Sequence, residues 1–115
     1  ADVVVTNPTE IAVALHYDTS KMAAPQVVAK GERLIAEEIR SIAEEHKIPI
    51  IQNIDLARTL FRSTAVGQEI PFELYQAVAE VLAFVFKLRR QKSALTKRIR
   101  VYPPRNQGAY QVGAG

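Results

Sequence analysis

Apolar residues follow two different periods along the chain, and the change between them predicts an α/β fold. Nearly continuous apolar runs over 3–6 and 11–17 predict strands whose two faces are both buried. A shorter run over 26–30 predicts a third strand, and another over 48–51 predicts a fourth. Between these last two, the apolar positions of residues 32–47 recur at the period of a helix.

The helix expected at 32–47 is amphipathic. Ile35, Ile39 and Ile42 share one face by their 4-3 spacing, and we expect this face to be buried. Gly31 comes just before the helix and is expected to end the third strand.

Two more helices are expected, from Leu56 to about Thr64 and from Pro71 to about Arg90. The second of these is apolar over more than the stripe of about 100° that a surface helix needs. We therefore expect it to be sandwiched inside the domain, with a docking surface for a partner as the alternative. One of its two apolar rows consists of Phe72, Tyr75, Ala79, Leu82 and Phe86.

Together these elements predict an α/β domain over residues 1–90, with a small mixed sheet of about four strands packed by three to four helices. A tight turn at Asn7 predicts an antiparallel hairpin, and the helix between the third and fourth strands predicts a right-handed parallel crossover. After Arg90 the apolar pattern fades, so residues 91–115 are expected to form a flexible basic tail.

Composition excludes several kinds of site. The 115 residues include no cysteine and two histidines, so we expect no disulfide, no metal site and no cofactor. A phosphate-binding glycine loop and a nucleophile elbow are both lacking, which disfavours a multiple-turnover enzyme. No apolar run reaches the roughly 18 residues of a membrane span, so the chain is expected to be a soluble piece of a longer protein.

Charge is distributed unevenly. The net charge is +3, but eight basic and no acidic residues lie between 87 and 105, which leaves seven basic against twelve acidic residues in 1–86. A basic tail could contact phosphates, so a small nucleic-acid-binding module is an alternative function. The tail lacks regularly placed aromatic residues, and we expect it to be solvated and to bind no nucleic acid.

The stretch Thr6-Asn7-Pro8-Thr9-Glu10 carries the most specific chemistry. Because Pro8 has no N–H, it cannot attack the Asn7 side chain as the following residue usually does. The Asn7 amide nitrogen can instead attack its own backbone carbonyl, which expels Pro8 as a new N-terminus. A strained turn would bring the attacking nitrogen within reach.

Several blocks of the chain resemble the cytoplasmic domain of the FlhB/YscU family of type III export-switch proteins. The resemblance covers about residues 1–90. Its blocks include Val3-Val4-Val5-Thr6-Asn7-Pro8-Thr9, Ile11-Ala12-Val13-Ala14-Leu15, Val27-Val28-Ala29-Lys30-Gly31, Gly67-Gln68-Glu69-Ile70-Pro71 and Ala77-Val78-Ala79-Glu80-Val81-Leu82-Ala83.

This resemblance implies a domain that cuts itself between Asn7 and Pro8, into pieces 1–7 and 8–115 that stay associated. It implies a switch of the export apparatus from rod- and hook-type to filament-type substrates, at the cytoplasmic face of the bacterial inner membrane. The implied partners are the membrane-embedded half of the same protein, other export-gate proteins, the hook-length control protein and exported rod and hook subunits. The block at 67–83 favours a flagellum over a virulence injectisome.

By the same resemblance, Asn7 is the nucleophile, Pro8 carries the leaving nitrogen and Thr9 shapes the loop. The family has His where this chain has Glu10. A carboxylate is a weaker base than imidazole and places negative charge beside a developing oxyanion, so we expect slower cleavage.

The resemblance also implies an apolar docking patch for export substrates. It lies near Ala24-Pro25 and the last helix, where Ala79 and Leu82 share one row and complete it.

Overall fold

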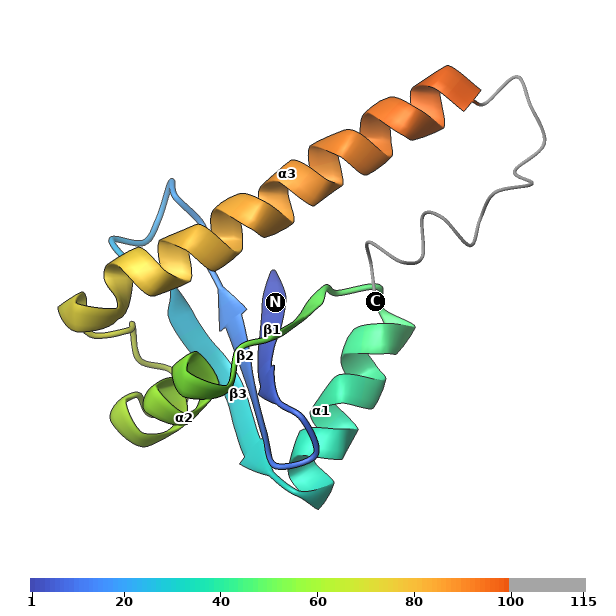
Figure 1. The fold of residues 1–115 in the computed structure, drawn as a ribbon. Coiled ribbons are helices and arrows are strands. Elements are labelled where there is room, and N and C mark those ends of the chain that lie inside the picture. Colours follow the sequence, from blue (N-terminus) through green and yellow to red (C-terminus); the bar gives the residue numbers. More distant parts are fainter. Residues whose placement is uncertain (100–115) are drawn as a thin grey trace.

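The computed structural model describes residues 1–99, with side chains as far as Lys92; residues 100–115 lie outside the described part (Figure 1). Its elements, in chain order, are β1 (Val3–Asn7), β2 (Ile11–His16), β3 (Gln26–Glu32), α1 (Leu34–Glu45), β4 (Ile50–Gln52), α2 (Ile54–Ser63), the 3-10 turn η1 (Phe72–Leu74) and α3 (Tyr75–Ile99).

The four strands form one mixed sheet in the order β3-β2-β1-β4, which confirms the predicted fold class. β2 pairs antiparallel with both β1 and β3, whereas β4 pairs parallel with β1. β4 therefore runs in the same direction as β3 but lies three places from it in the sheet. The chain reaches it through α1, and β1 becomes an interior strand with partners on both sides.

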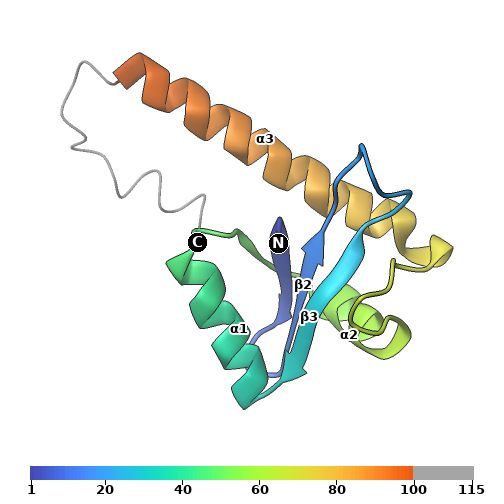
Figure 2. The same ribbon diagram turned by 180° about the vertical axis from the view of Figure 1, so that it is seen from behind.

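Helices cover both faces of the sheet, with α1 on one side and α2 and α3 on the other (Figures 1 and 2). Alternate residues of β1 serve the two layers. Val3 and Val5 join the core beneath α2 and α3, and Val4 joins the smaller core beneath α1. This is why the apolar run of β1 is continuous, since neither face of the strand meets water.

Helix α3 packs on one face of the sheet and is not sandwiched, so that expectation was wrong. Its buried stripe is Val78, Val81, Leu82 and Val85, at the spacing of a single helix face. Other apolar positions on the helix, such as Phe84, remain half exposed. The helix also continues to Ile99, so the expected end at Arg90 was wrong as well. The rest of the predicted tail lies outside the described residues.

Helix α1 buries only part of the expected face, because Ile39 alone of its three isoleucines packs against the core beneath the helix. Ala36 and Ala43 contact the sheet, whereas the side chains of Ile35 and Ile42 are 52% and 48% exposed. The strand residues beneath α1 are also small, so the helix lies close to the sheet and larger side chains move to its flank. Gly31 does not end β3 but lies inside it, directly under Ile35.

We predict that Gly31→Ala destabilises the domain by about 1–3 kcal/mol, the range for overpacking a core. The added methyl would overlap Ile35 Cγ2 and lie 2.6 Å from Ile35 Cβ, so α1 would have to move off the sheet. Urea unfolding of native and variant chains measures the change. Ile35→Ala should recover only part of the loss, because the Ile35 Cβ remains. Equal stability of Gly31→Ala and the native chain would contradict this packing.

Candidate functional site

The predicted cleavage stretch forms a tight turn between β1 and β2. Asn7 is the last residue of β1, and the Glu10 N–H donates to the Asn7 carbonyl oxygen at 3.0 Å. Pro8 occupies the second position and Thr9 the third, where φ is 64°. This is the pattern of a type II turn, whose third position normally holds glycine. A β-branched residue at positive φ is strained by about 1–2 kcal/mol.

Backbone hydrogen bonds from two other parts of the chain hold this turn on both sides. The Arg33 N–H, just before α1, donates to the Glu10 carbonyl at 2.9 Å. The Asn53 N–H, just before α2, donates to the Thr6 carbonyl at 2.9 Å. Asn53 is itself fixed, since its side-chain oxygen caps α2 by accepting the Leu56 N–H at 3.2 Å. The strained turn is therefore clamped between two helix starts.

The residues of the turn differ in exposure. Asn7 is 8% exposed, whereas Pro8, Thr9 and Glu10 lie at the surface. Among the described residues, none hydrogen-bonds to the Asn7 carboxamide.

A concavity of about 380 Å³ adjoins the turn, with Thr6, Pro8, Thr9, Arg40, Ile50 and Gln52 around it. Sequence reasoning missed Arg40, Gln52 and the clamping role of Arg33. Arg40 and Gln52 line the concavity and Arg33 bonds the turn, but all three belong to segments distant in sequence from Asn7. No local sequence pattern therefore indicated them.

The four residues predicted to bind a partner surround one apolar groove. Ala24, Pro25, Ala79 and Leu82 all line a concavity of about 300 Å³. Ala24 and Leu82 are buried and form its base, whereas Ala79 is exposed. Aromatic and small side chains complete the wall: Tyr17, Ala23, Tyr75, Ala83 and Phe86.

The groove and the turn lie at opposite ends of β2. The turn leads into Ile11, and Tyr17 directly follows His16 at the other end. Six strand residues span roughly 20 Å. The two sites are therefore separate and are connected through the sheet.

The described residues, 1–99, contain neither a metal-binding cluster nor a membrane-spanning helix. No cluster of three or more His, Cys, Asp or Glu side chains there could hold a metal ion. Within the same described part, none of the helices combines the length and apolar character needed to cross a membrane.

Comparison with known proteins places this geometry in a family. A family model described as the FlhB HrpN YscU SpaS family matches residues 1–85. Flagellar biosynthetic protein FlhB of Salmonella typhimurium is 56% identical over 94 residues, which cover 82% of this chain and 24% of that protein. FlhB of Bacillus subtilis is 45% identical over 91 residues, covering 79% and 25%. The chain thus spans about a quarter of the length of these relatives.

Solved structures agree with the sequence comparison. The cytoplasmic domain of FlhB from Shewanella putrefaciens superimposes with a TM-score of 0.75 at 47% identity, covering 77% of this chain and 73% of that one. A mutated EscU C-terminal domain gives 0.72 at 33% identity, covering 73% and 84%. The sheet, the turn at Asn7 and these matches agree, and the chain belongs to the FlhB HrpN YscU SpaS family.

Proposed function

We propose that this chain is the part of a flagellar type III export apparatus that switches substrate specificity from rod- and hook-type to filament-type proteins. The switch is linked to self-cleavage between Asn7 and Pro8. The observation that carries the proposal is the turn bond from the Glu10 N–H to the Asn7 carbonyl oxygen, at 3.0 Å. The family and the flagellar names of the relatives support the setting.

The proposed chemistry needs only the atoms of the turn. The Asn7 amide nitrogen attacks the Asn7 carbonyl carbon and closes a five-membered ring. As negative charge grows on the carbonyl oxygen, the Glu10 N–H stabilises it as an oxyanion-hole donor would. The bond to Pro8 then breaks, the proton lost by the amide passes to the Pro8 nitrogen, and a succinimide remains at Asn7.

Cleavage would leave the two pieces together. β1 pairs with β2 through five residue pairs, Val3↔Leu15 to Asn7↔Ile11, and with β4 through three. Val3, Val4 and Val5 are at most 2% exposed. Because this strand is interior and fully packed, cutting the turn after Asn7 removes a covalent link without removing a core contact.

The groove beside α3 is the proposed docking site for exported rod and hook subunits. Ala24, Pro25, Ala79 and Leu82 give it an apolar lining, which suits an apolar stretch of a subunit. The remaining partners follow from the same proposal. They are the hook-length control protein, other export-gate proteins and the membrane half of this protein, at the cytoplasmic face of the inner membrane.

Two alternatives were open from the sequence. The 45–56% identity to the flagellar relatives favours a flagellum over an injectisome. A nucleic-acid module would use the basic tail, whose residues 100–115 lie outside the described part. Its test is a steep loss of RNA or DNA binding with added salt.

Glu10→His is predicted to accelerate cleavage about 10-fold to 100-fold, because imidazole can relay the amide proton and removes negative charge near the oxyanion. An intact-mass time course on purified protein follows the 1–7 and 8–115 pieces. Asn7→Ala is the control and should give no cleavage. Rapid and complete release by the native chain would refute the proposed slowing by Glu10.

Thr9→Gly is predicted to slow cleavage and to stabilise the uncut chain by about 1 kcal/mol, since glycine adopts positive φ without strain. The stability change is best measured in an Asn7→Ala background, so that all molecules are uncut. Thr9→Ala, which keeps a Cβ, should recover little of this stability. If Thr9→Gly is no more stable than Thr9→Ala, strain at this position is not stored in the turn.

Ala79→Asp is predicted to weaken binding of a purified hook-type subunit by at least about 10-fold, because the carboxylate would be desolvated in an apolar groove. Phe84→Asp is the matched control. It adds the same charge at an exposed apolar position of α3 that does not line the groove. Circular dichroism checks that both variants fold. Unchanged binding by folded Ala79→Asp would place the docking site elsewhere.

A further inference from the structure

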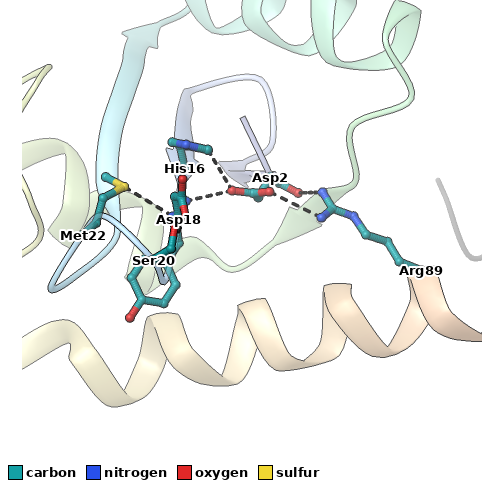
Figure 3. Close-up of polar contacts among 7 residues, drawn as sticks. Asp2, His16, Asp18, Ser20, Met22 and Arg89 are labelled. Carbon is teal, nitrogen blue, oxygen red and sulfur yellow. Dashed lines mark hydrogen bonds and ion pairs between the residues drawn. The ribbon is translucent and has the colours of Figure 1, made fainter.

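A polar cluster at the N-terminus of β1 connects that strand to β2 and α3 (Figure 3). Both carboxylate oxygens of Asp2 are engaged. Oδ2 accepts the Tyr17 N–H at 2.7 Å and lies 3.0 Å from His16 Nδ1. Oδ1 accepts from Arg89 Nη1 at 3.4 Å.

The backbone of Asp2 is used as well. Its N–H donates to the Leu15 carbonyl at 2.7 Å, and its carbonyl accepts from Arg89 Nη2 at 3.2 Å. Arg89 thus contacts both the side chain and the main chain of one residue that lies 87 positions away. The Asp2 side chain is 16% exposed, so these contacts are partly shielded from solvent and salt.

Tyr17, which Asp2 contacts directly, and Phe86, which lies beside Arg89, both line the groove. The Tyr17 backbone is bonded to Asp2, and the Arg89 guanidinium that Asp2 holds lies 5.5 Å from the centre of the Phe86 ring. Asp2 therefore fixes one groove residue through the backbone of β2 and a second through α3.

We propose that Asp2 is a positioning residue for the apolar groove and couples the groove to the strand that precedes the cleavage turn. This inference rests on the proposed docking function. Asp2 belongs to the 1–7 piece, whereas Tyr17, Phe86 and Arg89 belong to the 8–115 piece. Displacing β1 frees both aromatic residues and so weakens binding of a partner that needs them in place. By linkage, binding of that partner favours the state with β1 in the sheet by the same factor as the displacement weakens binding.

The two connections can be separated by substitution. Asp2→Ala removes both, whereas Arg89→Met removes only the connection to Phe86. Asp2→Asn keeps an acceptor for the Tyr17 N–H but loses the charge that faces Arg89, so it should behave like Arg89→Met. Glu45→Gln is the matched control, because it removes one negative charge from an exposed position on α1, across the sheet.

The experiment combines NMR of the 115-residue chain with titration of a purified hook-type subunit, all in an Asn7→Ala background. For Asp2→Ala we expect the Tyr17 amide to exchange at least about tenfold faster, the Phe86 and Leu82 signals to shift, and affinity to fall about threefold to tenfold. For Arg89→Met and Asp2→Asn we expect shifted Phe86 signals, a protected Tyr17 amide and a loss of about twofold to threefold. Glu45→Gln should match the parent.

If the substitutions only destabilise the domain in general, amide exchange will rise along all of β2, and Arg89→Met will affect the Tyr17 amide as much as the Phe86 signals. That result would overturn the proposal. Unchanged Phe86 and Leu82 signals in Asp2→Ala would overturn it too. If the parent chain does not bind the subunit, the docking function fails. The NMR signals of the groove then still decide whether Asp2 positions it.

Discussion

The interior position of β1 is the constraint on which the rest of the structure depends. The strand is hydrogen-bonded on both edges and packed on both faces, so its three valines belong to two different cores. One end of the strand carries Asn7 and the other carries Asp2. The orientation of the turn and one wall of the groove are therefore both set by where this strand lies.

The turn is strained at Thr9 and is also held rigidly by backbone hydrogen bonds, and the strain can persist only because of these bonds. Positive φ at Thr9 would relax if the loop were free to move. The Arg33 and Asn53 amides prevent this by bonding the carbonyls on either side of the turn. Because both amides belong to helix starts that are anchored by the cores, folding energy keeps the Asn7 carbonyl against the Glu10 N–H.

Much of the fold could be predicted because its strands are buried on both faces, which produces continuous apolar runs. The buried face of α1 could not, since hydrophobicity alone favours Ile35 over Ala36. What decides the face is the close approach of helix and sheet, which Gly31 permits from another element. The stripe of α3 was likewise hidden, because the helix exposes apolar residues on the groove side.

The candidate sites divide in the same way. Asn7 and Pro8 could be recognised from the sequence because their chemistry involves two adjacent residues. The groove residues came from a family resemblance, and the structure brings them together from the β2–β3 connection and α3. Asp2 and Arg89 are 87 positions apart, so no local pattern could pair them.

In the proposed function, the strength of each contact limits how far it could shift the groove between two states. Moving a two-state equilibrium from one form almost fully to the other requires about 5.5 kcal/mol. A partly exposed ion pair such as Asp2–Arg89 supplies only about 1 kcal/mol or less, so it can bias the groove but cannot switch it alone. Burying one valine side chain contributes about 1.5–3 kcal/mol, and β1 buries three. In the proposed function, these valines keep β1 in the sheet after cleavage, so the two pieces stay together. Cleavage after Asn7 would free only the end of the strand, because an uncut turn ties that end to β2.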